Sequence, residues 1–368
     1  YRLRDPLRRR SRRSLHPSPL DPLQVDISSK EMAKKIQLVI DKGDRAPDAR
    51  TKAPADTIRV LENDGYTPWH ITVDPAWSHV KKLFILCWSL FIFCLRIPRG
   101  SELFVQYPLT NLFWIFLPLL RLKRVHITML VHDLETYRFS GTMDPKETAK
   151  FNCANTLILP SPTMEQLLRP TGLAVEDIRY HYLWPYLLPL ERPIGTPQSP
   201  NIPRQIVFAG NLTKSAFLSQ LSSLQNPSYT IKLYGGGYTP NLAIEGFVSY
   251  HGIFTPDTPT IEGDWGMVWE GNSLDACSGE IGDYLRMCAS HKLSLYLAMG
   301  LPVIVWKEAA VAPFVENNNL GIALSNLYEL EGRLSKMSVE EYSLIKQAVQ
   351  QMSTKVRTGQ LFITSLHS

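Results

Sequence analysis

The sequence lacks several features that would assign it to particular classes of protein. No apolar run reaches the roughly twenty residues that a bilayer-spanning helix needs, and the longest, residues 83–95, is interrupted by Ser89. The five cysteines show no C-x-x-C spacing, which favours a reducing compartment over a disulfide framework. No repeat of 20 to 50 residues is visible. These absences exclude a disulfide-built miniprotein and give no sign of a solenoid, and the run 83–95 is too short for a bilayer-spanning helix.

Charge of one sign is scarce except at the start of the chain. Residues 1–13 hold seven arginines and one aspartate and so carry a charge of +6. The net charge of the whole chain is +5, so the remaining residues together carry −1. This balance gives no general signature of nucleic-acid binding. The first 31 residues have no apolar core of a secretory signal. We expect them to be an unstructured leader, either upstream or non-native sequence, with Met32 as the natural start; a basic arm and an organelle transit peptide are the alternatives.

What is present is the alternation of short apolar strands and helices that is typical of parallel α/β sheets. We expect strands near residues 36–40, 69–73, 103–106, 126–131, 156–159 and 179–183, and again at 206–209, 229–233, 266–269 and 302–306. Helices are expected at 54–63, with Pro54 at its first position, and at 83–95, 112–122, 292–299 and from 339 onward.

The spacing of these elements predicts two domains of similar size. We assign residues 32–190 to an N-terminal Rossmann-like domain, 191–204 to a proline-rich linker, and 205–350 to a C-terminal Rossmann-like domain. A C-terminal helix at 351–368 would cross back to the first domain. The carboxyl ends of the two sheets would then face a cleft.

Three segments of the second half carry residues suited to an anion. Gly210, Asn211 and Lys214 follow one strand, and Gly235 lies in a glycine-rich turn after the next. Backbone N–H groups at such turns bind phosphates, although an ordinary turn explains either glycine equally well. Lys292 stands at the start of a helix, where the helix dipole favours an anion rather than a cation, so a bound anion would explain it; a solvated lysine is the alternative.

The segment 291–304 (HKLSLYLAMGLPVI) resembles the nucleotide-sugar motif of two-domain GT-B glycosyltransferases. Together with 265–271 (WGMVWEG), 277–279 (CSG) and 282–285 (GDYL), it resembles the bacterial β-1,6-galactofuranosyltransferases and the glucosyltransferase that extends N-acetylglucosamine on streptococcal adhesins. In the first half, the resemblance rests on Val131-His132-Asp133, Arg138 and residues 52–56.

The resemblance implies a donor site and an acceptor site. The donor residues would be Gly210, Asn211, Lys214, Gly235, Asp283, Tyr284, Arg286, His291, Lys292, Ser294 and Tyr296, and the acceptor-side residues Lys52 and Arg138. The chain departs from many GT-B enzymes in having Leu295 where an acidic residue binds the ribose, so Ser294 is assigned to that contact.

The expected catalytic residues are Asp133 and His132, at the end of a strand. Asp133 would accept the proton of an acceptor hydroxyl; its alternative role is to cap the next helix. The chain has no Asp-x-Asp, so no metal site is expected, and fixed positive groups would stabilise the leaving diphosphate. No cofactor is expected beyond the UDP-sugar donor.

The sequence thus predicts a cytoplasmic, metal-independent, inverting hexosyltransferase that acts from a UDP-sugar on a glycan acceptor, with galactofuranose preferred. Glucosyl or galactosyl transfer to a glycoprotein glycan and a non-catalytic GT-B partner are the alternatives. The acceptor can be lipid-linked, because the apolar runs 83–95 and 112–122 suit either core helices, which we favour, or contact with the inner face of the membrane. No nucleic-acid partner is expected, and a homo-oligomer is left open.

Overall fold

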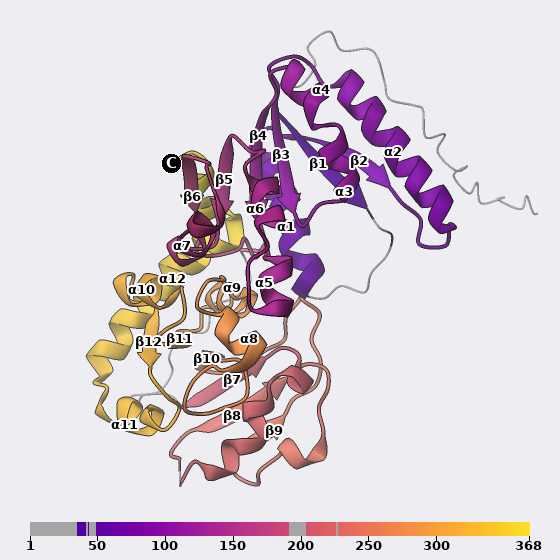
Figure 1. The fold of residues 1–368 in the computed structure, drawn as a ribbon. Coiled ribbons are helices and arrows are strands. Elements are labelled where there is room, and N and C mark those ends of the chain that lie inside the picture. Colours follow the sequence, from indigo (N-terminus) through magenta and orange to yellow (C-terminus); the bar gives the residue numbers. More distant parts are fainter. Residues whose placement is uncertain (1–34, 42, 44–48, 191–203, 226) are drawn as a thin grey trace, which may run out of the picture. The chain divides into compact units, whose positions relative to one another are not determined.

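The computed structural model describes residues 35–41, 43, 49–190, 204–225 and 227–368. They form two parallel six-stranded sheets with helices between the strands (Figure 1). The expected leader at 1–31 and nearly all of the expected linker at 191–204 lie outside the described residues, so the domain boundaries stay a prediction.

The first sheet has the strand order β2-β1-β3-β4-β5-β6. Its strands are β1 (Lys35–Asp41), β2 (Thr67–Thr72), β3 (Glu102–Tyr107), β4 (His126–Val131), β5 (Thr156–Leu159) and β6 (Asp177–Tyr180). Its helices are α1 (Ala49–Asn63), α2 (His79–Arg96), α3 (Asn111–Ile115), α4 (Leu117–Leu122), α5 (Glu135–Ser140), α6 (Pro145–Phe151), α7 (Pro162–Leu168) and the 3-10 turn η1 (Arg169–Thr171). The central strands β3 to β5 are almost wholly buried, as near-continuous apolar runs predict.

The second sheet has the order β12-β11-β10-β7-β8-β9. Its strands are β7 (Gln205–Ala209), β8 (Thr230–Tyr234), β9 (Val248–Tyr250), β10 (Trp265–Val268), β11 (Val303–Trp306) and β12 (Gly321–Leu324). The helices are α8 (Gly279–Tyr284), α9 (His291–Ala298), α10 (Ala312–Asn317), α11 (Glu329–Lys336), α12 (Val339–Thr358) and α13 (Gln360–Leu366), with 3-10 turns η2 (Leu212–Lys214), η3 (Ala216–Ser223) and η4 (Pro240–Leu242). Read from the other side, this is the order of a dinucleotide-binding Rossmann sheet.

Several expected elements needed correction. Helix α1 begins at Ala49, so Pro54 lies inside it rather than at its first position. The single helix expected at 112–122 is two helices, because Pro118 lies in the first turn of α4 after a break at Phe116. The strand expected at 179–183 is Asp177–Tyr180, since the chain reverses at Tyr182 with a positive φ of 50°.

The end of the chain packs on the first sheet. Helix α12 begins at Ser338, whose hydroxyl accepts the Glu341 N–H, and ends at Gly359 with a φ of 72°. After this turn, the ring of Phe362 on α13 lies 6.4 Å from that of Phe104 on β3, edge to face. His367 contacts Asp64 at 3.0 Å. Segments far apart in sequence therefore share one core.

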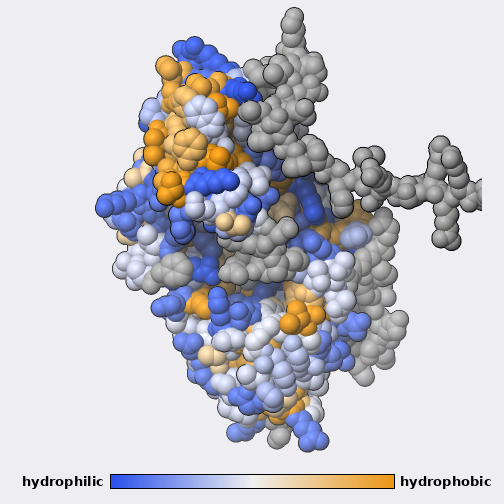
Figure 2. Space-filling model, turned by 90° about the vertical axis from the view of Figure 1, so that its right-hand side faces the viewer, coloured by the Kyte–Doolittle hydropathy of each residue, from blue (hydrophilic) through white to orange (hydrophobic). Residues whose placement is uncertain are grey.

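Helix α2 packs its buried residues Leu90, Phe93 and Cys94 toward the first sheet's core. The expectation of a core helix at 83–95 holds for these residues, whereas Leu83, Phe84, Trp88 and Leu95 are exposed, and hydrophobic side chains gather on the surface in the upper part of Figure 2. No helix within the described ranges is long and apolar enough to cross a membrane.

Candidate functional site

The second sheet has a topological switch point between β7 and β10. These strands are hydrogen-bonded neighbours, and the chain leaves them toward opposite sides of the sheet: β8 lies beyond β7, and β11 beyond β10. In open parallel sheets, ligands bind outside the carboxyl ends of the strands at such a point. Gly210 directly follows β7, and Glu270 follows β10 by two residues.

Lys292 reaches this switch point from the second position of α9. Its ammonium pairs with the Glu270 carboxylate and lies 4.8 Å from the centre of the Phe208 ring. A Cβ atom at Gly210 would lie only 2.6 Å from Cε of Lys292, so a glycine there lets the lysine pass. The Lys292 and Glu270 side chains are only 13% and 14% exposed. Lys292 therefore lies at the loop that begins with Gly210, as the sequence predicts, and it pairs with the Glu270 carboxylate in this structure.

The two glycine-rich turns pack directly on each other. A Cβ atom at Gly235 would lie 1.8 Å from the carbonyl oxygen of Gly210, and φ of Gly235 is 128°. No side chain fits in this crossing, so both turns present backbone to the same edge. Asn211 directly precedes the 3-10 turn η2 and Lys214 ends it, and both side chains are exposed. Lys214 is thus free of packing constraints, unlike Lys292.

Arg286 and Asp283 lie at the end of α8, on the surface. Arg286 pairs with Glu308, and its guanidinium lies 4.4 Å from the centre of the Trp306 ring. Asp283 is exposed, 3.9 Å from Arg286. A bound anion would have to compete with these carboxylates for the guanidinium.

Three predicted donor residues are enclosed. Ser294 and Tyr296 are fully buried on α9, and the Tyr296 hydroxyl accepts the Ala209 N–H at 2.8 Å. His291 lies against Tyr186 at 5.1 Å between ring centres, and burial lowers its pKa to about 3. In this structure, Ser294 and Tyr296 present no surface to a ligand. Their packing instead holds α9, and with it Lys292, against β7 and β10.

The first sheet presents His132 and Asp133 directly after β4. The His132 ring stacks on Trp184 at 4.4 Å, and its Nε2 lies 2.7 Å from Oε1 of Gln106, near the end of β3. Burial lowers the pKa of His132 to about 3. The imidazole is therefore neutral in the folded protein over the physiological pH range.

Asp133 pairs with Arg138 at 2.6 Å, and both side chains are 37% exposed. Burial raises the pKa of Asp133, while Arg138 and a hydrogen bond from Tyr284 oppose this shift. A carboxylate with a raised pKa and partial exposure is a suitable proton acceptor. The structure thus places both predicted residues, Asp133 and Arg138, at one edge and joins them.

Tyr284 brings the second half of the chain to this edge. Its hydroxyl accepts the N–H of Leu134 at 2.8 Å, and Arg138 lies 5.9 Å from the centre of its ring. Burial raises the pKa of the Tyr284 phenol, so it stays protonated and can donate to Asp133. Asp133, Arg138 and Tyr284, which the sequence assigned to two different subsites, form one cluster.

Glu147 is a functional residue that the sequence did not reveal. Its buried carboxylate accepts the N–H groups of Glu135 at 2.8 Å and Thr136 at 2.9 Å, the Tyr107 hydroxyl at 2.8 Å and the Thr136 hydroxyl. It therefore caps α5, whose own N-cap residue, Leu134, makes no side-chain bond. The alternative role of Asp133 as the cap is excluded, because Glu147 fills it from 14 residues away.

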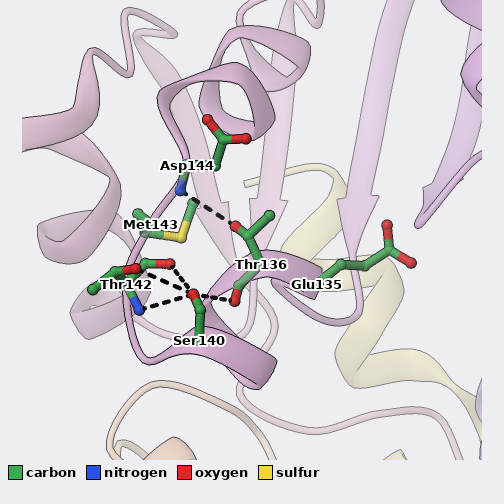
Figure 3. A pocket seen from close by; sticks show the side chains of 6 residues that line it. All are labelled: Glu135, Thr136, Ser140, Thr142, Met143 and Asp144. Carbon is green, nitrogen blue, oxygen red and sulfur yellow. Dashed lines mark hydrogen bonds between the residues drawn. The ribbon is translucent and has the colours of Figure 1, made fainter.

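A pocket of about 490 Å³ opens beside this helix. Its lining residues are Glu135, Thr136, Ser140, Thr142, Met143 and Asp144. Thr136, Ser140 and Thr142 face one another and are joined by hydrogen bonds, whereas Glu135 points away from them (Figure 3). The pocket begins two residues after Asp133, and the Thr136 and Ser140 hydroxyls in its lining are already engaged in hydrogen bonds within the protein.

Lys52, predicted on the acceptor side, is buried in an ion-pair network. Its ammonium lies 2.8 Å from Asp56, 2.8 Å from Asp257 and 3.2 Å from the Leu187 carbonyl oxygen. These three acceptors match its three N–H donors, so no donor is left for an acceptor sugar in this structure. Lys52 instead ties α1 to a loop of the second half. Among the described residues, no group of three His, Cys, Asp or Glu side chains is placed to hold a metal ion.

Family comparison agrees with this geometry. The N-terminal domain of the "Glucosyltransferase 3-like" family matches residues 35–181, and its C-terminal domain matches residues 206–367. The chain belongs to the glucosyltransferase 3-like family. The resemblance predicted from the sequence is therefore confirmed: this family of glycosyltransferases is the one to which the chain belongs.

Individual relatives include two curated enzymes. The chain is 27% identical to the β-1,6-galactofuranosyltransferase WbbI of Escherichia coli K12 over 86% of this chain and 92% of the relative. It is 27% identical to glucosyltransferase 3 of Streptococcus gordonii over 66% of this chain and 70% of the relative.

Solved structures confirm the fold. Anabaena HepE, crystallised with UDP and glucose, has a TM-score of 0.54 at 12% identity and covers 89% of this chain and 96% of its own. The lipopolysaccharide outer core galactosyltransferase WaaB has a TM-score of 0.54 at 11% identity, over 90% of this chain and 99% of its own. The GT-B fold predicted from the sequence is thus confirmed.

Proposed function

We propose that this chain transfers a hexose from a UDP-sugar to a sugar hydroxyl of a growing glycan or polysaccharide. The observation that carries the proposal is the pairing of Gly210 and Lys292 at the switch point of the second sheet, with Lys292 ready to exchange a carboxylate for a diphosphate. Lysine at this position serves as a point charge for phosphate. The proposed reaction is cytoplasmic.

The donor site uses fixed positive groups. The diphosphate would displace Glu270 from Lys292 and accept hydrogen bonds from backbone N–H groups that follow Gly210 and Gly235 in their turns, since the N–H groups of these two glycines already donate to the carbonyl oxygens of Tyr234 and Gly252. Lys214 and Arg286 are the further positive groups that we assign to this site. As the bond between the anomeric carbon and the diphosphate oxygen breaks, its electron pair goes to the diphosphate, and Lys292 stabilises that charge. We propose that no metal ion is needed for this step.

The acceptor site uses Asp133. The acceptor oxygen attacks the anomeric carbon from the face opposite the leaving group, which inverts the configuration, and its proton passes to Asp133. Arg138 and Tyr284 hold the carboxylate in place through their contacts with it. His132, which is neutral and anchored to Gln106, supports the loop that carries Asp133.

Galactofuranose is our first choice of hexose. The match to WbbI extends over more of this chain than the match to glucosyltransferase 3, at the same identity. A lipid-linked oligosaccharide is the corresponding acceptor. Glucosyl or galactosyl transfer to a glycoprotein glycan is the second choice.

A two-step experiment tests the proposal. Thermal shift with UDP first establishes nucleotide binding, and a screen of UDP-sugar hydrolysis, including the galactofuranose form, then identifies the donor. Both steps are run with excess chelator, and NMR of the product reports its anomeric configuration. Binding of UDP without any turnover would favour a non-catalytic GT-B partner, and loss of turnover in chelator, restored by Mg²⁺ or Mn²⁺, would contradict metal independence.

A further inference from the structure

Helix α2 carries an apolar stripe that no other part of the described chain covers. Val80, Phe84, Trp88 and Leu95 are 79%, 66%, 54% and 51% exposed. They are spaced by four, four and seven residues, which puts them on one face of a helix. Single exposed apolar residues are ordinary on protein surfaces, but an aligned set of this size marks an interaction site.

The stripe is separate from the face by which α2 packs on its sheet. Leu90, Phe93 and Cys94 are fully buried there, so the exposed side chains are not needed for the core. Polar residues normally occupy the outer face of such a helix. Here both faces are apolar, which is costly in water unless the outer face is covered.

The stripe continues onto the neighbouring helices. The rings of Trp88 and Phe91 lie 5.9 Å apart, and those of Phe91 and Phe116 lie 6.3 Å apart, which links α2 to the junction of α3 and α4. On the two sides of this junction, Ile115 at the end of α3 and Leu122 at the end of α4 are again exposed. We call this surface the α2–α4 face; it gathers the hydrophobic residues in the upper part of Figure 2.

The charges of this segment have one sign. Between residues 79 and 124 there are seven basic residues and one acidic residue, Glu102. The basic residues are Lys81, Lys82, Arg96, Arg99, Arg121, Lys123 and Arg124. They stand near both ends of α2 and around the end of α4, so they flank the stripe.

We propose that the α2–α4 face docks on an anionic lipid bilayer. Apolar and aromatic side chains flanked by Lys and Arg are the combination that holds a helix in the lipid interface, and Trp88 suits the headgroup level. Docking of a second copy through the same face would bring seven cations against seven, which charge repulsion opposes. This proposal does not rest on the proposed catalytic reaction.

The test is vesicle flotation with the full chain. Vesicles contain either phosphatidylcholine alone or phosphatidylcholine with phosphatidylglycerol, and the bound fraction is measured at low and high salt. We expect binding to the anionic vesicles that weakens as salt rises, and little binding to phosphatidylcholine alone. All variants keep residues 1–31, so the basic start of the chain contributes equally to each.

Two variants of matched chemistry isolate the face. Val80→Ser with Leu95→Ser removes one valine and one leucine from it; Val339→Ser with Leu344→Ser removes the same pair from the exposed surface of α12. We expect the first variant to bind about tenfold less and the second to bind like the wild type. Phe84→Ser with Trp88→Ser should bind less than either, and unchanged melting temperatures confirm that all variants fold.

Three outcomes would overturn the proposal. The two matched variants may not differ in binding, as expected if only the basic start of the chain contacts lipid. The wild type may bind phosphatidylcholine as well as it binds the anionic vesicles. Light scattering may show a dimer that Phe84→Ser with Trp88→Ser dissociates, which would assign the face to a second copy of the chain.

Discussion

The edges of the two sheets hold their charged groups in opposite ways. At the first, Asp133 pairs with Arg138 and both are 37% exposed; at the second, Lys292 pairs with Glu270 and both are about 14% exposed or less. Asp133 is positioned by side chains, namely Arg138 and Tyr284, whereas Lys292 is positioned by the absence of a side chain at Gly210. The open pair suits exchange of a proton with an incoming hydroxyl, and the enclosed pair suits exchange of one anion for another.

The largest effect should come from the open pair. Asp133→Asn keeps the size of the side chain but removes the proton acceptor, so we expect turnover to fall by about 10²- to 10⁴-fold while UDP affinity stays within a few-fold. Helix α5 should be unaffected, because Glu147 caps it. Steady-state kinetics and calorimetry with UDP provide the two measurements.

The same assays on Glu135→Gln provide the comparison for Asp133. Glu135 is exposed and close in sequence, so its loss should change turnover little. A fully active Asp133→Asn enzyme combined with an impaired Glu135→Gln enzyme would move the base to Glu135 and break the contrast between the two edges.

A substitution of Glu147 tests whether this side chain stabilises the start of α5 at the edge of the first sheet. Glu147→Ala leaves two backbone N–H groups and two hydroxyls without their buried acceptor, so we expect the free energy of unfolding to fall by about 2–4 kcal/mol. Urea denaturation measures this. Glu308→Ala removes an exposed carboxylate that pairs with Arg286 at the surface and should cost about 1 kcal/mol or less. Equal losses in the two variants would contradict the role of Glu147.

The sequence predicted the sheets far better than the connections. Strands such as β10 and β11 are short, wholly apolar runs, and burial on both faces demands such runs. Strands β9 and β12 were missed, because they are only three and four residues long and β12 begins with a glycine, which is depleted in strands. The start of α1 was predicted five residues too late, at Pro54, because proline is common at the first position of helices and the residues of α1 before it include few apolar ones.

The candidate site was predictable only where a single segment carries the signal. Lys292 and Gly210 were found because each stands at the junction of a strand or helix with a loop. Glu147 was not, since its function depends on a hydrogen-bonding partner at another position in the fold, and no local pattern distinguishes it from a surface glutamate. The burial of Lys52 by Asp257, 205 residues away, was hidden for the same reason.

The enclosed pair makes Lys292 the next test. Lys292→Ala should weaken UDP binding by about 1.5–3 kcal/mol, the range for hydrogen bonds to a charged group. The fold should tolerate the change, although Glu270 loses its partner. Calorimetry measures the affinity, and Lys307→Ala, an exposed lysine after β11, serves as the control. Unchanged affinity in Lys292→Ala would remove this lysine from the donor site.

A buried histidine beneath the first edge should make the free energy of unfolding depend on pH in acid. His181 is fully buried against Trp184 beneath this edge, and burial together with the nearby His132 lowers its pKa to about 3. The unfolded chain binds the proton near pH 6.5, so this stabilisation is complete above about pH 6.5 and is lost as the pH falls toward 3. The slope is about 1.4 kcal/mol per pH unit for one histidine.

Between pH 6 and pH 4, we therefore expect His181→Phe to reduce the slope of the free energy of unfolding against pH by about 1.4 kcal/mol per pH unit, the contribution of one proton. Urea denaturation at several pH values measures the slope. His70→Phe, at an exposed position of β2, should leave it unchanged. An identical slope in His181→Phe and the wild type would show that His181 is not held neutral.

The smallest effect concerns the partner of Lys292. Glu270→Gln keeps a hydrogen-bonding group beside the lysine but removes the negative charge that a diphosphate must displace. Because repulsion between two anions at this distance is partly screened by water, we expect UDP to bind only about two- to fivefold more tightly. Calorimetry resolves this difference when Glu280→Gln, an exposed glutamate on α8, is measured in parallel. Weaker binding in Glu270→Gln would show instead that the carboxylate contacts the nucleotide itself. It would then supply the acidic group that Leu295 lacks, and the enclosed pair would be a preformed part of the donor site rather than a competitor for it.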